Sequence, residues 1–269
     1  MERLKPMTDM MTLSIENIVA GYGKQEILRG ASLVVKAREI VLLIGTNGSG
    51  KSTLLRVISG ILKPNSGLIR FEGEDITALP THERIAKGIA YLKQEVKVFP
   101  SLTVKENLHI AGHHLDEKLF RKRLDRVFHL FPKLGELYPR RAGLLSGGER
   151  QMLGFGLMLL HKPKLLLLDE PSAGGLTPVL AKEVFQTIQK INEEDGVSVL
   201  LVEQNIRQAM QIAHRVYLLR EGMTQHEARP TEVLEGGTLE QAFFGSAIHG
   251  CLDKKSVSHY SENCKGKLL

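Results

Sequence analysis

The fold of this chain is decided by the stretch Glu39-Ile-Val-Leu-Leu-Ile-Gly45-Thr-Asn-Gly-Ser-Gly50-Lys51-Ser52. The leucine-rich, β-branched residues before Gly45 predict a short buried strand, and residues Lys51 to about Ser59 have a helical pattern. Gly45 to Ser52 fit the phosphate-loop pattern G-x-x-x-x-G-K-[ST], in the strand–loop–helix context that this pattern requires. Glycines let successive backbone N–H groups turn toward phosphate oxygens, and the helix N-terminus adds a favourable dipole. The stretch therefore predicts a site for the phosphates of a nucleotide.

Two side chains of this loop have distinct expected roles. Lys51 supplies positive charge to the β- and γ-phosphates, and the Ser52 hydroxyl can bind Mg²⁺. A purely structural turn is the alternative, but four specified positions match by chance in only about one chain in a hundred of this size. We expect the nucleotide to contact Gly45, Asn47, Gly48, Ser49, Gly50, Lys51, Ser52 and Thr53.

A second apolar strand is predicted over Leu165–Leu168, and it ends in Asp169-Glu170. An aspartate at the end of a buried strand lies at the sheet edge that faces the phosphate loop, where it can hold Mg²⁺. Glu170 is then placed to orient or deprotonate an attacking water. By itself, Asp-Glu at the end of a strand is weak evidence for a catalytic site, since such side chains usually just face solvent. The phosphate loop makes this evidence specific.

Composition restricts the class of protein. The 269 residues are 42% hydrophobic and 25% charged, which is ordinary for a soluble globular protein, and the net charge of +6 is compatible with a mildly basic surface. Tryptophan is absent and aromatic residues make up 5%, so we expect no aromatic platform for nucleic acid. Cys251 and Cys264 lack metal-ligand spacing and are expected to be reduced thiols in a cytosolic protein.

Membrane and secretion signals are not predicted. The stretch Met1–Met11 has no continuous apolar core and no small-residue cleavage site, so it does not resemble a signal peptide. No apolar run approaches the roughly 18 residues that a membrane-spanning helix needs. If a membrane is involved, other chains must cross it.

The order of elements predicts an α/β protein. Two further strands are expected at Leu13–Ile18 and Ser32–Val35, and an apolar strand at Val197–Val202 follows a predicted helix over Pro178–Asn192. This strand–helix–strand order favours a parallel sheet with right-handed crossovers. From about Val104 to Leu160 the patterns are mainly helical, including Lys118–Leu130 and Gln151–Leu160, which predicts a helical insert.

The motif Leu145-Ser-Gly-Gly-Glu149-Arg-Gln151 identifies a family. Alone it predicts only a flexible loop that opens a helix, with Ser146 as N-cap. It nevertheless resembles the signature motif of ABC (ATP-binding cassette) ATPases, and it lies in the expected order between the phosphate loop and Asp169. In that family two cassettes dimerise head to tail, and the signature of one closes over the γ-phosphate held by the other. The resemblance implies nucleotide contacts for Ser146, Gly147, Gly148 and Glu149, with ATP as the nucleotide.

The same resemblance covers about Leu13 to Gly245 and implies a P-loop NTPase (RecA-like) core with an antiparallel β subdomain and an inserted α-helical subdomain. It places one nucleotide-binding domain at residues 12–245, with the helical part at about 95–162. The stretch 246–269 is rich in Ser, Lys and Asn and predicts a poorly ordered polar tail.

Further residue roles follow from the resemblance. Tyr22 matches the aromatic residue that stacks on adenine. Gln94 matches the glutamine that senses Mg²⁺ and the attacking water, and it couples the site to the helical insert. Ser172 to Pro178 matches the loop that crosses the dimer interface. Gln204 occupies the position usually held by a switch histidine; its neutral amide can bond a γ-phosphate but cannot carry a proton.

The subgroup is indicated by Glu203-Gln204-Asn205, which resembles the ATPases of branched-chain amino-acid importers and their relatives for urea or amides. The run Asp75–Arg84, with Gly88–Tyr91 and Val98–Val104, has the same resemblance. Three departures are visible: Ser172–Pro178 is one glycine longer than the family's loop, Leu157 replaces a usual arginine, and Lys93 replaces a common proline. None affects Lys51, Asp169 or Glu170, so we expect an active enzyme, with a reduced rate if these changes matter.

These observations predict the ATP-hydrolysing motor of an importer for branched-chain amino acids or similar small polar solutes. The expected partners are a second cassette (an identical copy or a paralogue), integral membrane permease subunits and, indirectly, a substrate-binding protein, at the cytoplasmic face of the membrane. A non-transport ABC ATPase of cluster assembly, translation or DNA repair is the alternative. A second cassette and a long coiled-coil insertion are not seen, which disfavours translation and DNA repair. A purely regulatory nucleotide binder is disfavoured because Glu170 is present.

Overall fold

The structure is a computed structural model that describes residues 11–173 and 177–235. The chain divides into two compact units, residues 1–228 and 229–269. The described part of the second unit contains the short helix α9, Pro230–Glu235. The predicted domain end at residue 245 and the predicted polar tail 246–269 lie outside the described residues.

A six-stranded sheet forms the centre of the first unit, in the order β10-β9-β3-β8-β7-β6. Five of its strands are parallel, and β10 pairs antiparallel with β9 at one edge. The strands are β3 (Ile40–Ile44), β6 (Ile89–Leu92), β7 (Leu165–Asp169), β8 (Ser198–Val202), β9 (Arg215–Arg220) and β10 (Met223–Ala228). All five residues of β3, β7 and β8 are buried, which is expected for parallel strands covered on both faces.

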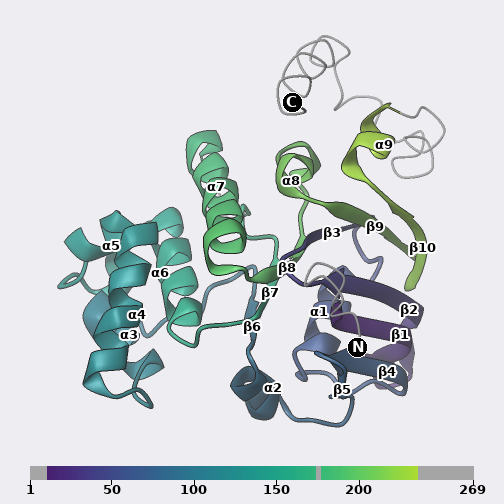
Figure 1. Ribbon diagram of the computed structural model, residues 1–269, viewed down its shortest axis with the longest axis horizontal. Coiled ribbons are helices and arrows are strands. Elements are labelled where there is room, and N and C mark those ends of the chain that lie inside the picture. The colour runs from purple at the N-terminus through teal and green to yellow at the C-terminus, as the bar shows by residue number, and fades with distance from the viewer. Residues whose placement is uncertain (1–10, 174–176, 236–269) are drawn as a thin grey trace, which may run out of the picture. The chain divides into compact units, whose positions relative to one another are not determined.

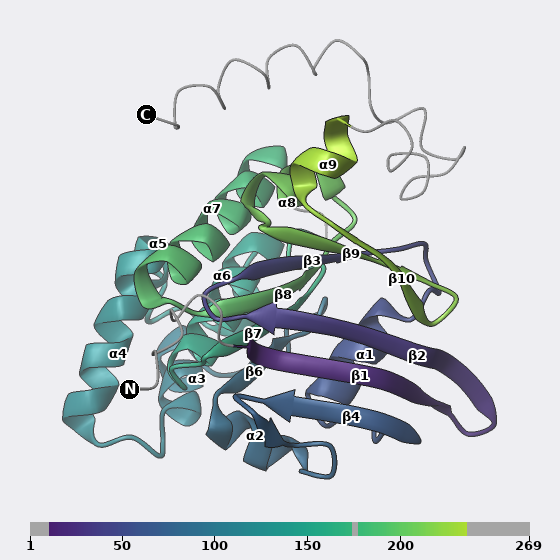
Figure 2. The same cartoon turned by 45° about the vertical axis from the view of Figure 1, so that its right-hand side comes forward.

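A second sheet is antiparallel and has the order β2-β1-β4-β5. Its strands are β1 (Met11–Tyr22), β2 (Gln25–Lys36), β4 (Ser66–Phe71) and β5 (Glu74–Asp75). Helix α1 (Lys51–Ile58) contributes Leu54, Leu55, Val57 and Ile58 to one apolar core shared with both sheets. Figures 1 and 2 show α1 on one side of β3 and β8, with α7 (Pro178–Asp195) and α8 (Ile206–Ile212) on the other.

The middle of the chain forms a group of helices, as the sequence predicts. They are α3 (Val104–Ala111), α4 (Glu117–Leu130), α5 (Pro132–Glu136), the 3₁₀ turn η2 (Ala142–Leu144) and α6 (Gly147–Leu159). Capping boxes begin two of them, at Thr103 for α3 and at Ser146 for α6. A separate helix, α2 (Thr81–Lys87), precedes β6. No helix of the described residues has the length and apolar composition needed to cross a membrane.

The predicted elements are present, but several boundaries differ. Strand β1 runs from Met11 to Tyr22 rather than from Leu13 to Ile18. Its pairing with β2 shifts register between Ile15 and Ile18, and Asn17 has a positive φ of 49°. This irregularity interrupts the apolar alternation on which the prediction depended. Helix α6 begins at Gly147 rather than Gln151 because the capping box extends it over two glycines with low helix propensity.

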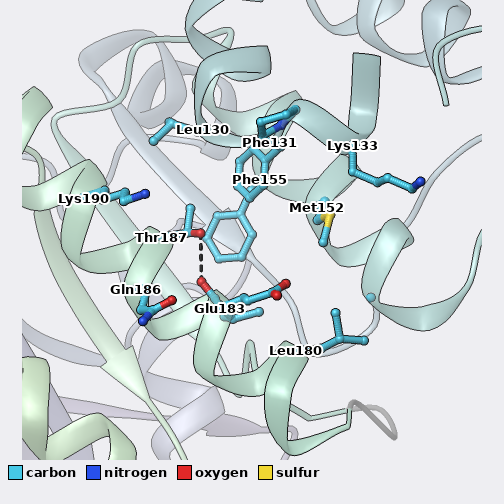
Figure 3. A pocket seen from close by; sticks show the side chains of 13 residues that line it. Leu130, Phe131, Lys133, Met152, Phe155, Leu180, Glu183, Gln186, Thr187 and Lys190 are labelled. Atoms are coloured by element: carbon cyan, nitrogen blue, oxygen red, sulfur yellow. Dashed lines mark hydrogen bonds between the residues drawn. The ribbon is translucent and has the colours of Figure 1, made fainter. Parts of the chain in front are cut away.

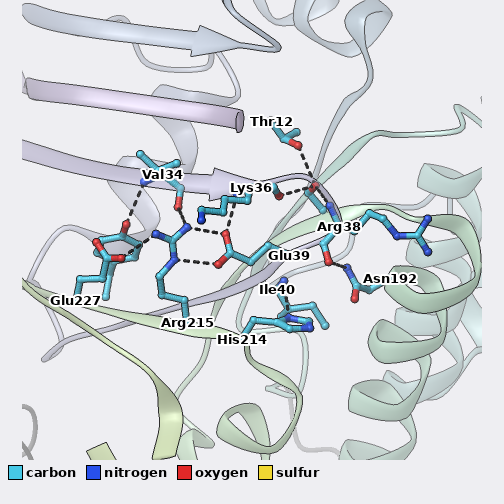
Figure 4. A network of polar contacts seen from close by, with 12 residues as sticks. Thr12, Val34, Lys36, Arg38, Glu39, Ile40, Asn192, His214, Arg215 and Glu227 are labelled. Atoms are coloured by element: carbon cyan, nitrogen blue, oxygen red, sulfur yellow. Dashed lines mark hydrogen bonds and ion pairs between the residues drawn. The ribbon is translucent and has the colours of Figure 1, made fainter. Parts of the chain in front are cut away.

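A polar network joins the amino ends of the central strands to the antiparallel sheet (Figure 4). Arg215 binds both carboxylate oxygens of Glu39 at 2.9 and 2.6 Å, and it donates to the Val34 carbonyl at 3.1 Å. Glu39 also accepts the backbone N–H of Lys36 at 2.7 Å, and Arg215 donates to Glu227 at 2.8 Å. The network fixes the turn that leads into β3.

Candidate functional site

The phosphate loop follows β3 and ends where α1 begins. Gly48 and Gly50 have φ angles of 81° and 106°, in the left-handed region where glycine is favoured. Gly45 is required for a different reason, since a Cβ there would lie 2.2 Å from the Leu219 carbonyl oxygen. Thr46 and the predicted residues Asn47 and Gly48 are exposed, whereas Ser49 and Gly50 are buried. The loop thus presents an open backbone turn at a helix N-terminus.

Lys51 lies in this turn and is only 7% exposed. Its ammonium group donates to the carbonyls of Gly45 at 2.8 Å and Thr46 at 3.1 Å, so it lies back over the loop. Burial lowers the pKa of Lys51, while the carboxylates of Glu170 and Asp169 oppose that shift. The Ser49 hydroxyl is buried and has no hydrogen-bond partner within the described residues. A buried donor without a partner in a phosphate loop is what a phosphate oxygen would satisfy.

Asp169 ends β7 and its carboxylate is held from two elements. Ser52 on α1 donates to Oδ1 at 2.9 Å, and Tyr91 on β6 donates to Oδ2 at 3.0 Å. The sequence predicted that Ser52 and Asp169 face each other, and their side chains do so across 117 residues of chain. Burial and the nearby Asp169 charge raise the pKa of Tyr91, which keeps its hydroxyl a donor.

Glu170 follows directly and is held by both predicted glutamines. Gln94 donates to Oε2 at 3.0 Å and Gln204 donates to Oε1 at 2.9 Å. The backbone N–H of Glu170 donates to the Val202 carbonyl at 2.8 Å, and its φ is 51°, an uncommon value for a residue with a side chain. The two amides hold one carboxylate oxygen each and so fix the direction of the carboxylate.

Tyr22 lies apart from the carboxylate cluster. It ends β1, is 45% exposed, and its hydroxyl accepts a hydrogen bond from Arg56 of α1 at 2.8 Å. An exposed aromatic ring offers a stacking surface. Arg56 was not among the predicted residues, although its place on the helix that follows the phosphate loop could have indicated it.

The residues Ser146 to Glu149, which the resemblance assigns to the nucleotide, do not lie against the phosphate loop of the same chain. Ser146 and Glu149 satisfy each other: the Ser146 hydroxyl accepts the Glu149 N–H at 3.3 Å, and Glu149 accepts the Ser146 N–H at 2.8 Å. No hydrogen bond of residues 11–173 and 177–235 joins these four residues to residues 45–53. In Figures 1 and 2, α6 lies with the other helices of the insert, away from α1. Of the predicted interface loop, residues 174–176 with the extra glycine lie outside the described residues.

The donors fit a magnesium nucleotide. Ser52 and Asp169 supply hydroxyl and carboxylate oxygens, which are ligands that Mg²⁺ prefers, usually together with substrate phosphates and water. Among the residues that the structure describes, no group of three or more His, Cys, Asp or Glu could hold a metal alone. A metal at this site would therefore depend on oxygens of the nucleotide.

A cavity of the protein lies elsewhere (Figure 3). It has a volume of about 240 Å³ and is lined from α5 and α6 on one side and α7 on the other, including Phe131, Phe155 and Leu180. None of its lining residues belongs to the phosphate loop, although Gly148 of the predicted signature contacts is among them.

Comparison with known proteins identifies the family. Residues 28–173 match the family model described as ABC transporter. The chain is 43% identical over 233 residues to the high-affinity branched-chain amino acid transport ATP-binding protein BraG of Pseudomonas aeruginosa. This match covers 87% of this chain and 99% of BraG. This chain belongs to the ABC transporter family. It is also 41% identical over 226 residues to the probable branched-chain amino acid transport ATP-binding protein LivF of Archaeoglobus fulgidus, covering 84% of this chain and 95% of LivF.

Solved cassettes of the ABC family share the fold. The ADP conformation of the cassette MJ1267 superimposes with a TM-score of 0.77 at 30% identity, over 88% of this chain and 99% of that one. The cassette MJ0796, solved as a dimer bound to ADP and Pi, gives a TM-score of 0.72 at 25% identity, over 81% and 98%. The predicted P-loop NTPase fold is confirmed, and the chain is an ABC cassette that binds and hydrolyses ATP.

Two residues of the cluster were not predicted. In the sequence, Tyr91 appears only within a run that resembles the family, although a tyrosine at the carboxyl end of a strand beside β7 is placed to reach Asp169. In the sequence, Glu203 appears only as part of the run Glu203-Gln204-Asn205. Its buried carboxylate accepts the backbone N–H of Ser172, two residues after Glu170.

Proposed function

We propose that this cassette drives an importer of branched-chain amino acids or similar small polar solutes, as part of a complex with separate membrane permease subunits. The observation that carries the proposal is the Glu170 carboxylate, fixed between Gln94 and Gln204 next to Asp169. The names of BraG and LivF support the cargo class and the transport role. A peripheral location at the cytoplasmic face of the membrane follows from this assembly.

In the proposed reaction, backbone N–H groups of residues 45–50 and the Lys51 ammonium bind the β- and γ-phosphates of ATP. Ser52 and Asp169 would hold Mg²⁺, with Gln94 close by, and the ion when bound neutralises charge on these phosphates. The exposed ring of Tyr22 stacks on adenine. Binding thus fixes the γ-phosphoryl group beside Glu170.

Glu170 is the proposed general base. Water attacks the γ-phosphorus, its proton passes to a Glu170 oxygen, and the bond from the γ-phosphorus to the bridging oxygen of ADP breaks. Gln94 and Gln204 orient the carboxylate from its two oxygens. Since the amide of Gln204 cannot accept this proton, Glu170 must accept it alone.

A second cassette completes the proposed site. Ser146, Gly147, Gly148 and Glu149 form a helix N-terminus at which Ser146 and Gly147 are exposed, but they do not reach the phosphate loop of their own chain. We expect them to contact the γ-phosphate held by the other cassette, whether that is an identical copy or a paralogue. Closure on ATP would move the permease subunits through the helical insert at about 95–162.

The test is purification of the tagged full-length chain from native membranes in mild detergent, followed by mass spectrometry of its partners. We expect polytopic membrane proteins and a second cassette. In parallel, cells lacking the chain should lose uptake of labelled leucine, isoleucine and valine, and Glu170→Gln should not restore it although the complex still forms. Recovery of soluble partners only, with normal uptake, would favour a non-transport ABC ATPase instead.

A further inference from the structure

Glu203 is a buried carboxylate directly after β8, with 3% of its surface exposed. Its Oε1 accepts the backbone N–H of Ser172 at 2.7 Å. Its Oε2 accepts the backbone N–H groups of Gln204 at 3.0 Å and Asn205 at 3.2 Å. One side chain therefore holds the backbone of two loops, the one after β7 and the one after β8.

The two loops carry Glu170 and Gln204, the side chains proposed to act in hydrolysis. Ser172 lies two residues beyond Glu170, and Gln204 is the residue whose amide donates to Glu170 at 2.9 Å. The backbone of Glu170 is in the left-handed region, a conformation that persists only where the surroundings hold it. Glu203 binds the chain on both sides of the contact between Glu170 and Gln204.

Burying the Glu203 carboxylate costs folding free energy. Burial raises the pKa of Glu203, while hydrogen bonds from Ser172, Asn205 and Gln204 oppose the shift. These partners are backbone N–H groups and a hydroxyl rather than a cation, so the carboxylate is buried without an opposite charge among them. A buried charge retained at such a cost needs a reason beyond packing.

We infer that Glu203 is a positioning residue for hydrolysis, which fixes Glu170 and Gln204 relative to each other through the backbone N–H groups of Ser172, Gln204 and Asn205. The inference rests on the proposed role of Glu170 as base. Without the Glu203 carboxylate, the N–H groups of Ser172 and Gln204 lose their acceptor, and the two loops separate or shift. The phosphate loop is held by other contacts, so nucleotide binding is retained.

The test compares Glu203→Gln with Glu39→Gln in the full-length chain. Glutamine at 203 keeps the shape, but its NH₂ group would face backbone N–H donors. Glu39 is the matched control, since its carboxylate also accepts a backbone N–H and is mostly buried, but at the amino end of β3 (Figure 4). For each variant we would measure kcat and KM for ATP, the Kd of a fluorescent ATP analogue, and the melting temperature.

We expect Glu203→Gln to lower kcat by roughly tenfold to a hundredfold, the effect of misplacing a hydrogen-bonded charged group, with Kd within about twofold of the wild type. Glu39→Gln should lower the melting temperature and leave kcat nearly unchanged. In combination with Gln204→Ala, the loss from Glu203→Gln should be less than additive, since both act on Glu170.

Two results would overturn the inference. One is a Glu203→Gln enzyme with wild-type kcat, whatever its melting temperature. The other is a fully additive double variant, which would mean that Glu203 acts independently of Gln204. In either case the wild type still hydrolyses ATP, and the proposed function stands. If the wild type hydrolyses no ATP, the proposed function fails and the inference fails with it.

Discussion

Gln204 donates its amide N–H to Glu170 Oε1 at 2.9 Å. The other oxygen of the same carboxylate is bound by Gln94 at 3.0 Å. Each amide therefore fixes one oxygen, and the orientation of Glu170 depends on both. Both glutamines are exposed at the surface, and both amides contact the proposed base.

Gln204→Ala should lower kcat by roughly tenfold or more, because hydrogen bonds to charged groups are worth about 1.5–3 kcal/mol. Gln204→Glu should be worse, since a second carboxylate would repel Glu170. Steady-state ATPase assays check both, with Gln189→Ala on the exposed face of α7 as the control. Full activity of Gln204→Ala would show that Gln94 suffices.

Ser52→Ala should raise the Mg²⁺ concentration needed for half-maximal ATPase activity. The substitution removes the hydroxyl that donates to Asp169 at 2.9 Å and that we propose as a magnesium ligand. Ser52→Thr should retain the normal requirement. Ser59→Ala, at the other end of the same helix, is the control and should change nothing in the magnesium titration. A normal requirement in Ser52→Ala would exclude the ligand role.

Arg84→Met should destabilise the protein strongly, because Arg84 is only 2% exposed and its guanidinium donates to carbonyls at the end of α1 and before α2. Buried acceptors left without donors cost about 1–3 kcal/mol each, so we expect a loss of at least about 3 kcal/mol. Arg70→Met removes an exposed ion pair with Glu16 and should cost less than about 1 kcal/mol. Urea unfolding measures both, and equal losses would contradict this account.

The stability of the protein should fall between about pH 10 and pH 12, because burial and a hydrogen bond to Glu227 raise the pKa of Tyr217 from 10.0 to about 12. In that window the unfolded chain has lost the tyrosine proton and the folded chain retains it, so the free energy of unfolding decreases as pH rises. Tyr217→Phe should flatten this decline. Circular dichroism at increasing pH measures it, and a slope unchanged by the substitution would be inconsistent with a buried Tyr217 proton.

Much of the fold could be predicted because its signals are local. The run from Glu39 to Ser52 specifies a strand, a glycine turn and a helix within fourteen residues of chain, and the structure has all three. Strands β7 and β8 were visible as short apolar runs because parallel strands are buried on both faces. The full length of β1 was not predictable, since Asn17 interrupts its alternation.

The site was less predictable where it depends on distant parts of the chain. Ser52 and Asp169 were paired correctly because both belong to motifs with known spacing. Tyr91 binds Asp169, 78 residues away, and Glu203 binds Ser172, 31 residues away, and no local pattern encodes these two contacts. The exposed ring of Tyr22 and its Arg56 partner likewise require the pairing of β1 with its neighbours to be known first.

The central claim is that Glu170 accepts the proton from the attacking water, and Glu170→Gln tests it most directly. The variant should bind ATP with near wild-type affinity and form a stable ATP-bound dimer, while its turnover falls by at least about a hundredfold, as expected for loss of a general base. ATP binding, dimer formation and steady-state ATPase activity should be measured on the same preparation. Undiminished turnover by Glu170→Gln would contradict the account, because the glutamine amide cannot take the proton.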